Sequence, residues 1–210
     1  MIYGGADPDR FSPDGVVRRG VLFVGRITPH KGVDRLLAAL PGDAELRIAG
    51  TTGHDPNPPE REYPDLLRRL AARRRVHFLG AVADSDLPVL YRQAQMLVLP
   101  SVHRTCYGRD IAVSELLGLT AIEAMASGTP VVASRIGGLP EVIEDGVTGF
   151  LVEPGNVAEL RARLAEVLGD PRLAQRLGRN GRERVLDRFT WTACAERCLA
   201  AYSELDTEAR

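Results

Sequence analysis

Hydrophobic residues occur along this chain in short continuous runs that alternate with segments where they recur at helical spacing. The short runs are rich in Val, Ile and Leu, which is typical of parallel strands whose two faces are both covered. They predict strands at 21–25, 45–49, 76–79, 96–99, 130–134 and 149–152. The helical spacing predicts helices at 31–40, 60–74, 85–94, 119–127, 138–144, 157–168, 171–187 and 190–204. The alternation predicts an α/β fold, a doubly wound, Rossmann-like parallel sheet of about six strands with helices on both faces.

The same pattern divides the chain into one large domain and two flanking segments. Residues 1–20 have no periodicity and contain several turn formers, so we predict a linker remnant that lies outside the core and follows a missing domain. Residues 21–188 are predicted to form the α/β domain, and their number is usual for one domain. Residues 189–210 are predicted to form a final helix.

Composition limits the class of protein. Hydrophobic residues make up 44% of the 210 residues and charged residues 26%, which is ordinary for a globular domain. The formal net charge of -1 provides no field that would favour nucleic acid or an anionic membrane. We expect a cytoplasmic protein, because the chain has no apolar stretch of membrane-spanning length, no signal peptide, and only three cysteines.

The loops after the strands are where doubly wound sheets bind ligands. The first such loop carries Gly25, Arg26 and Lys31, which is the single lysine among 27 basic residues. The glycine fingerprints of dinucleotide-binding and P-loop proteins are absent from it. Two cations five residues apart, at a strand end and a helix start, suit a diphosphate. A solvated basic loop would explain the same spacing, and the residues alone leave both interpretations open.

A second candidate anion site precedes the strand at 130–134. Gly118 is a poor interior helix residue, so the helix is predicted to begin just after it, with the N–H groups of Leu119 and Thr120 facing the crevice. Glu115 then lies in the loop before the helix and Glu123 about one turn inside it. Carboxylates here suit the hydroxyls of a sugar nucleotide. Thr120 and Glu123 also have the spacing of a capping box, which needs no ligand.

Together these segments resemble the carboxyl-terminal domain of glycosyltransferase family 4, retaining hexosyltransferases of the GT-B fold. The resemblance extends from Gly4 to about residue 205. The motifs that carry it are Val24-Gly-Arg26 with Lys31-Gly-Val-Asp34, Glu115 and Glu123 separated by seven residues, Ala124-Met-Ala-Ser-Gly-Thr-Pro-Val-Val-Ala-Ser134 and Gly137-Gly-Leu-Pro-Glu141.

The resemblance implies roles for these residues. Arg26 and Lys31 would bind the donor diphosphate and stabilise its developing charge, and Glu115 would bind hydroxyls of the transferred sugar; these three are the expected catalytic residues. Glu123 would bind the ribose, and the base would lie near the ends of the second and third strands. The expected donor-binding residues are Gly25, Gly118, Leu119, Thr120, Glu123, Gly50 and Val82.

The resemblance also implies the partners. The donor would be a nucleoside diphosphate sugar, with UDP favoured over GDP and ADP, and we expect no cofactor and no nucleic acid. We expect no metal, since the Asp-x-Asp spacings at Asp7 and Asp84 fit a linker and a helix start. The missing amino-terminal domain would supply the acceptor site, and the final helix would pack back toward it. Arginines crowded within 68–75 predict a solvated helix face, with peripheral membrane contact of the full-length enzyme left open.

Two questions stay open at this point. The segment 102–114 is longer than in the family and could reach an acceptor, cover the donor or form a plain surface loop. The chain itself could be a domain of an active two-domain transferase that binds donor without turnover. It could also be a subunit that needs a separate amino-terminal partner, or a non-catalytic module that binds nucleotide sugars.

Overall fold

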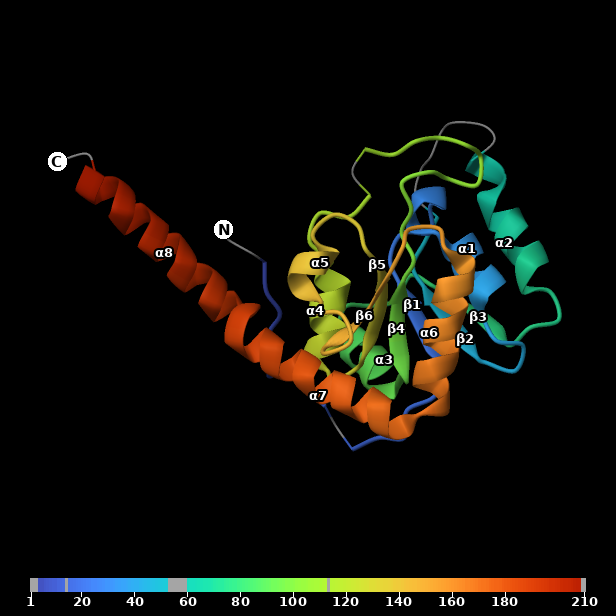
Figure 1. Ribbon diagram of the computed structural model, residues 1–210, viewed down its shortest axis with the longest axis horizontal. Helices are drawn as coiled ribbons and strands as arrows, with labels where there is room; N and C mark the ends of the chain where they lie inside the picture. The colour runs from blue at the N-terminus through green and yellow to red at the C-terminus, as the bar shows by residue number, and fades with distance from the viewer. Residues whose placement is uncertain (1–3, 14, 53–59, 113, 209–210) are drawn as a thin grey trace.

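A computed structural model describes residues 4–13, 15–52, 60–112 and 114–208 of the protein (Figure 1). Its core is one six-stranded sheet in the order β3-β2-β1-β4-β5-β6, and every pair of neighbouring strands is parallel. The strands are β1 (Val21–Val24), β2 (Leu46–Ala49), β3 (Val76–Gly80), β4 (Met96–Leu99), β5 (Val131–Ser134) and β6 (Gly149–Val152). The predicted doubly wound parallel sheet is therefore confirmed.

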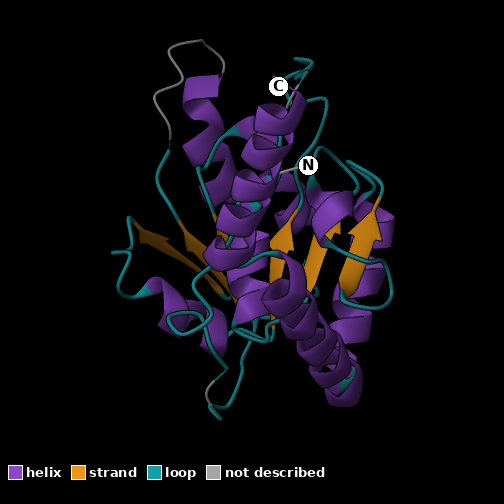
Figure 2. Ribbon diagram, turned by 90° about the vertical axis from the view of Figure 1, so that its left-hand side faces the viewer, coloured by secondary structure: helices purple, strands orange, loops and turns teal. Residues whose placement is uncertain are grey.

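Helices cover both faces of this sheet (Figures 1 and 2). One face packs against α1, α2, α6 and the first half of α7, and the other against α3, α4, α5 and the second half of α7. The helices are α1 (Val33–Ala39), α2 (Tyr63–Ala71), α3 (Leu87–Gln93), α4 (Leu119–Ala126), α5 (Leu139–Val142), α6 (Val157–Gly169), α7 (Pro171–Arg188) and α8 (Trp191–Glu208), with 3-10 turns η1 (Pro29–Lys31) and η2 (Glu60–Glu62).

The burial of β1 explains why its sequence is an unbroken apolar run. Successive side chains of a strand point to opposite faces of the sheet. Leu22 and Val24 accordingly belong to the core cluster on one face, and Val21 and Phe23 to the cluster on the other. Because both faces are covered, every position of the strand is buried, and no polar alternation is left for the sequence to display.

The strand order places two distant loops side by side. β1 pairs with β2 on one side and with β4 on the other, so the chain reverses its direction of winding between β1 and β4. In such sheets the crevice at this reversal, beyond the carboxyl ends of the strands, is where ligands bind. Here the loop after β1 meets the loop after β4 so closely that a Cβ on Gly32 would lie 2.0 Å from the Pro100 carbonyl oxygen.

The amino-terminal segment departs from its predicted character. It has no helix or strand in its described part, as a linker would, but Ala6 and Phe11 are buried in the core, so the prediction that it lies outside the core was wrong for these residues. Phe11 meets the Tyr91 ring edge-on at 5.9 Å between centroids. The segment is held because Ala6 N–H donates to the Phe189 carbonyl at 2.8 Å, beside the start of α8.

The arginines within 68–75 do not lie on one helix, so the prediction of a single helix face was wrong. α2 ends at Ala71, and Arg73 adopts a left-handed conformation with φ of 63°. Arg74 then donates to the Leu37 carbonyl at 2.6 Å, and Arg75 pairs with Glu45 at 3.2 Å. The chain reverses here to enter β3, which is why the basic residues are divided between a helix and a turn instead of forming a single face.

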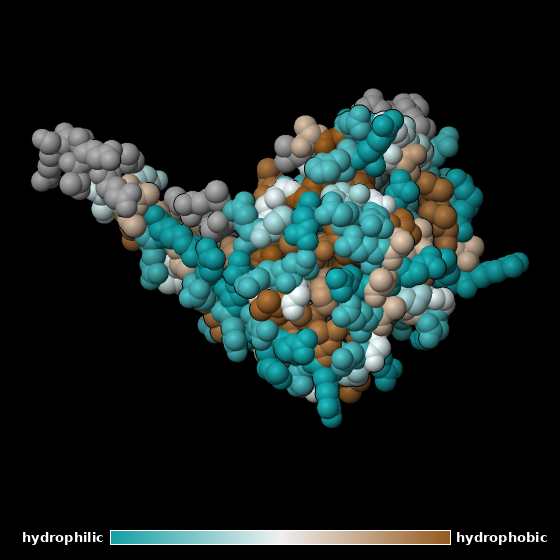
Figure 3. Space-filling model, viewed as in Figure 1, coloured by the Kyte–Doolittle hydropathy of each residue, from teal (hydrophilic) through white to brown (hydrophobic). Residues whose placement is uncertain are grey.

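The last helix, α8, extends away from the body of the domain, which the space-filling view also shows (Figures 1 and 3). Its large apolar side chains Trp191, Leu199 and Tyr202 are 55%, 66% and 67% exposed. Packing of this helix against a missing domain stays a prediction. Among the described residues, no helix is both long enough and apolar enough to cross a membrane.

Candidate functional site

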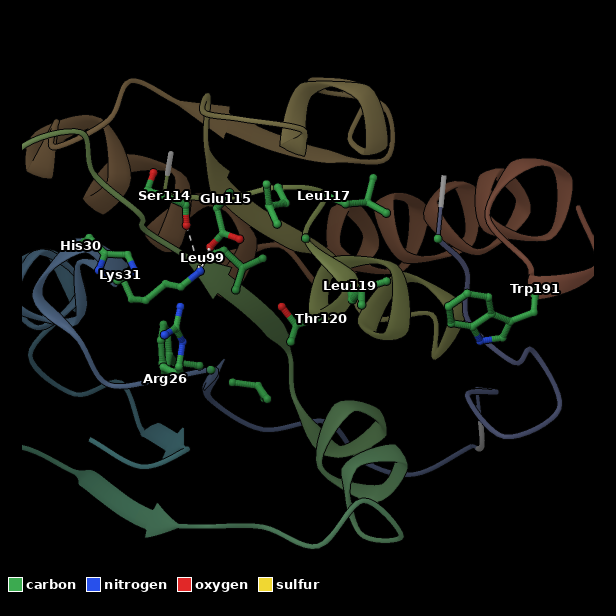
Figure 4. A pocket seen from close by; sticks show the side chains of 16 residues that line it. Arg26, His30, Lys31, Leu99, Ser114, Glu115, Leu117, Leu119, Thr120 and Trp191 are labelled. Atoms are coloured by element: carbon green, nitrogen blue, oxygen red, sulfur yellow. Dashed lines mark hydrogen bonds and ion pairs between the residues drawn. The ribbon is translucent and has the colours of Figure 1, made fainter. Parts of the chain in front are cut away.

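A cleft of about 560 Å³ lies at the reversal point between β1 and β4, bounded by the loop after β1, the loop before α4 and the start of α8 (Figure 4). Of the ten predicted site residues, seven line it. These are Gly25, Arg26, Lys31, Glu115, Gly118, Leu119 and Thr120. The remaining lining residues are Gly4, Phe23, Val24, His30, Leu99, Ser114, Leu116, Leu117 and Trp191. Two segments some eighty residues apart in sequence are thus brought to one cavity.

Lys31 and Glu115 are in direct contact at the floor of this cleft. Lys31 Nζ lies 2.6 Å from Glu115 Oε1 and donates a second hydrogen bond to the Ser114 carbonyl at 3.1 Å. The same Oε1 accepts from the buried Ser101 hydroxyl at 2.7 Å. The Lys31 side chain is only 16% exposed, so the alternative of a solvated lysine is wrong. Oε1 takes two donors, and among the described residues none donates to Oε2, which leaves Oε2 as the carboxylate oxygen open to a ligand.

Arg26 differs from Lys31 in being exposed. Figure 4 shows both side chains reaching from the first loop toward Glu115, with Thr120 on the far side of the gap. Among the described residues Arg26 forms no ion pair with an acidic side chain. A guanidinium that faces a cleft without a carboxylate partner offers its planar set of donors to a bound anion.

His30 lies between these cations and was not identified from the sequence. Its carbonyl accepts from Val102 N–H at 2.9 Å, and its ring nitrogen Nε2 lies 3.4 Å from Thr28 Oγ1. Burial and, after it, the charges of Lys31 and Arg26 lower the pKa of His30 below its ordinary value of 6.5. The imidazole is therefore neutral at pH 7 in the free chain.

The start of α4 supplies the second side of the cleft. Gly118 is the residue before the helix, has a φ of 84°, and a Cβ there would lie 2.5 Å from Leu139 Cδ2, so only glycine fits without displacement. In the part of the chain that the structure describes, no side chain caps this helix start. The amides of Leu119 and Thr120, the first two helical residues, are thus left to the cleft, where the helix dipole favours an anion.

Glu123 is not part of a capping box. Thr120 is the second residue of α4 and Gly118 is the capping residue, so the capping-box alternative is wrong. Glu123 Oε2 instead accepts from the Tyr91 hydroxyl at 2.8 Å. Burial raises the pKa of Glu123, while the Tyr91 hydrogen bond opposes the shift. Glu123 does not line the cleft described above, and its contact with a ribose stays a prediction.

Gly50 and Val82 also lie outside the lining of this cleft. A Cβ on Gly50 would lie 1.8 Å from the Gly25 carbonyl oxygen, so glycine is required there by the close approach of the loops after β1 and β2. Val82 is half-buried and packs against the core cluster that contains Tyr91. Both residues thus have structural roles that need no ligand. That the nucleotide base binds near them stays a prediction.

The segment after β4 is anchored to η2 and α2. Arg109 pairs with the buried Glu60 at 2.9 Å, and the Tyr107 ring meets the Tyr63 ring edge-on at 6.4 Å between centroids. Residue 113 lies outside the described residues, and none of residues 102–112 lines the cleft. The segment is therefore more than a plain solvated loop, and Ser114 at its end lines the cleft and accepts from Lys31 through its carbonyl. Cover over a bound donor stays a prediction. Contact with an acceptor stays a prediction.

The cleft also has an apolar end that the sequence did not reveal. Leu116 is 87% exposed, Trp191 comes from the start of α8, and Leu119 and Trp191 lie together at the end away from the cations (Figure 4). Nothing in the spacing of Trp191 could reveal this, because it reaches the cleft only through the path of the last helix. His30 could have been found, since it stands between two predicted ligands. Among the described residues no three metal-binding side chains lie close enough to hold a metal ion.

The chain is similar to known proteins over nearly its whole length. The family model described as "Glycosyl transferases group 1" matches residues 17–184. The MMP alpha-(1->4)-mannosyltransferase of Mycolicibacterium hassiacum is 36% identical over 95% of this chain and 47% of its own length. The D-inositol 3-phosphate glycosyltransferase of Corynebacterium glutamicum is 32% identical over 97% of this chain and 51% of its own. The chain thus spans about half the length of these relatives.

Solved structures agree with this similarity. Sucrose-phosphate synthase of Thermosynechococcus elongatus superimposes with a TM-score of 0.81 at 32% identity, over 99% of this chain and 53% of the other. Anabaena HepE in complex with UDP and glucose superimposes with a TM-score of 0.80 at 25% identity, over 96% of this chain and 56% of the other. The sheet and its helices match the Rossmann-like carboxyl-terminal domains of GT-B glycosyltransferases.

Proposed function

The chain belongs to the group 1 glycosyl transferases, and on that premise we propose that it is the donor-binding domain of a retaining glycosyltransferase of family 4. The observation that carries this proposal is the cleft in which Arg26 and Lys31 face the uncapped start of α4, with Glu115 between them. Cations on one side and free amides on the other are the two kinds of group that proteins use for phosphates.

We expect the donor to occupy this cleft in one orientation. Its diphosphate would lie between the first loop and the amides of Leu119 and Thr120, and its sugar would reach Glu115. Because Glu115 Oε1 already accepts from Lys31 and Ser101, Oε2 is the oxygen that would accept from a sugar hydroxyl. Glu123 would contact the ribose from its place beside Tyr91, and the base would lie near the ends of β2 and β3.

The chemistry follows from this placement. The bond between the sugar carbon and the diphosphate oxygen breaks, and negative charge develops on the leaving diphosphate. Arg26, Lys31 and the start of α4 stabilise that charge without having to reorganise, which lowers the barrier. The acceptor hydroxyl attacks from the same face, its oxygen bonds to the sugar carbon, and its proton passes to the leaving phosphate, which gives retention.

The nucleotide is proposed to be UDP, ahead of GDP and ADP. The support is the similarity to HepE, whose structures hold UDP, UDP with glucose, or UDP-glucose. A relative from Mycolicibacterium smegmatis is by its name a GDP-mannose-dependent mannosyltransferase. GDP is therefore the second candidate nucleotide. The proposal includes no cofactor, no metal and no nucleic acid, and a cytoplasmic location.

Titration calorimetry of the chain with UDP-, GDP- and ADP-glucose tests donor binding. We expect one of the three to bind, and Arg26→Ala to weaken it by about 2–5 kcal/mol, as for loss of one partner of a desolvated charge pair. Arg92→Ala, on α3 outside the cleft, is the matched control that should bind as the wild type does. If none of the three sugars binds, or if both variants weaken binding equally, the proposal is wrong.

A second experiment tests whether this chain alone transfers sugar. Because the relatives are about twice as long, we propose that an amino-terminal domain provides the acceptor site. The isolated chain should then bind donor but transfer no sugar to an acceptor, although slow hydrolysis of the donor is compatible with this view. Sustained transfer by the 210-residue chain would contradict it.

A further inference from the structure

The first loop holds a third side chain that can become a cation. His30 lines the cleft with Arg26 and Lys31 and is half-buried. Its position is fixed from two sides, because its carbonyl accepts from Val102 N–H and because Gly32, two residues on, packs against the Pro100 carbonyl. The backbone of His30 is thus held in place, and its imidazole lies 3.4 Å from Thr28 Oγ1 and next to the two cations that the proposed donor would contact (Figure 4).

We propose that His30 is a third, protonatable ligand of the donor diphosphate, so that donor binding takes up a proton at this imidazole. The inference rests on the proposed function, because it needs a diphosphate in this cleft. It adds a residue and a pH dependence that the roles of Arg26, Lys31 and Glu115 do not contain.

The charges around His30 explain why the proton arrives only with the ligand. Lys31 and Arg26 face it from its own loop, Arg109 from the segment after β4, and Glu115 from the loop before α4. Three cations outweigh one carboxylate, and burial acts in the same direction, so the free imidazole is neutral. A diphosphate joined to a sugar and to a nucleoside brings two negative charges, which reverse this balance and favour the imidazolium.

Thermodynamic linkage then sets the sign of the effect. If the pKa of His30 is higher with ligand bound than in the free chain, affinity rises as the pH falls through the interval between the two values. Each unit of pKa difference corresponds to about tenfold in affinity at the low-pH limit. A nucleotide sugar is the right probe because both ends of its diphosphate are esterified. A free nucleoside diphosphate would itself titrate at about pH 6.

The experiment is calorimetry of the chain with the nucleotide sugar that binds best, between about pH 6 and pH 8, in buffers of different ionisation enthalpy. We expect proton uptake and an affinity that rises at least about threefold toward the lower pH. His30→Gln should abolish the uptake and flatten the pH dependence, so that its loss of affinity relative to the wild type is largest at the lower pH.

A control variant and a replacement variant complete the experiment. His77→Gln is the matched control, because His77 lies on β3 outside the cleft, is 56% exposed and has Glu45 as its neighbour; it should keep the wild-type proton uptake. If His30→Gln fails to fold in a melting experiment, His30→Asn takes its place. A wild type that binds none of the nucleotide sugars overturns the proposed function and this inference together. Binding whose pH dependence is absent, or survives in the His30 variant, overturns this inference alone.

Discussion

Lys31 and Glu115, which lie 84 positions apart in the sequence, form an ion pair of 2.6 Å at the floor of the cleft. Their side chains are 16% and 10% exposed, so removal of either partner leaves the other charge poorly solvated. Ser101, in the loop after β4, donates to the same carboxylate oxygen. The pair thus joins the two halves of the site in the free chain and positions both groups before a ligand arrives.

Replacement of Lys31 by Ala is expected to affect both stability and binding. The variant should lose about 1–3 kcal/mol of stability in denaturant unfolding, because Glu115 loses a charged hydrogen-bond donor. It should bind the nucleoside diphosphate about 2–5 kcal/mol more weakly in calorimetry, and the nucleoside almost unchanged, because only the former has phosphates.

The double variant Lys31→Ala with Glu115→Gln is the control for that prediction. It should recover part of the lost stability, since no unpaired carboxylate remains. Equal weakening of nucleoside and nucleoside diphosphate would show that Lys31 does not contact the phosphates.

Ser101→Ala should weaken binding of the sugar part of the donor without affecting binding of the nucleoside diphosphate part. Without the Ser101 hydroxyl, Glu115 Oε1 keeps only Lys31, and the carboxylate can rotate away from the orientation that presents Oε2. The nucleotide sugar should bind about 0.5–1.5 kcal/mol more weakly, and the nucleoside diphosphate unchanged. Ser85→Ala, which changes an exposed serine in the turn before α3, is the matched control. A loss shared by both ligands would assign Ser101 to the fold alone.

Glu123→Gln should change how stability depends on pH. Burial raises the pKa of Glu123 above its ordinary value of 4.5, so ionisation costs more in the folded than in the unfolded chain. The stability of the wild type therefore falls as the pH rises from the pKa of Glu123 in the unfolded chain to its pKa in the folded chain. The variant has no carboxyl group at this position and lacks this loss. Melting curves should show the variant gaining on the wild type between about pH 4 and pH 7. A constant difference over that interval would contradict the assignment.

The same variant tests contact with the ribose. Gln still accepts a hydrogen bond from Tyr91 but has only one acceptor oxygen, so nucleotide binding should weaken by about 1–3 kcal/mol in calorimetry if Glu123 binds ribose hydroxyls. Tyr91→Phe removes the hydroxyl that donates to Glu123 and should lower stability. Unchanged nucleotide affinity in Glu123→Gln would leave the residue with a structural role only.

Gly32→Ala should disrupt the junction of the two loops. Gly32 has a φ of 67° and a Cβ there would lie 2.0 Å from the Pro100 carbonyl oxygen, so strain and collision add together. Gly80→Ala is a matched control, because Gly80 has a φ of 70° with nothing near its Cβ. The Gly80 variant should lose about 1 kcal/mol and the Gly32 variant clearly more in denaturant unfolding. Equal losses would show that the loops adjust freely.

Several features of the fold could be predicted from the sequence because they depend on local pattern. A strand covered on both faces is apolar at every position, as Leu22 and Phe23 illustrate by facing opposite clusters, and such runs were visible in order along the chain. The start of α4 could also be predicted from local sequence, since glycine is unfavourable inside a helix and Gly118 therefore marks the boundary. The sequence therefore determined the α/β class, the positions of the six strands and seven of the sixteen residues that line the cleft.

Tertiary structure alone decided which of those residues touch. Lys31 meets Glu115 because β1 and β4 are neighbours in the sheet, and strand order is not encoded in the spacing of either loop. Glu123 has the spacing of a capping box but bonds to Tyr91, because the helix begins at Leu119 and α3 packs against α4. Trp191 enters the cleft through the path of α8. Contacts of this kind arise from packing between distant segments, whereas periodicity and turn chemistry report only on a residue and its near neighbours.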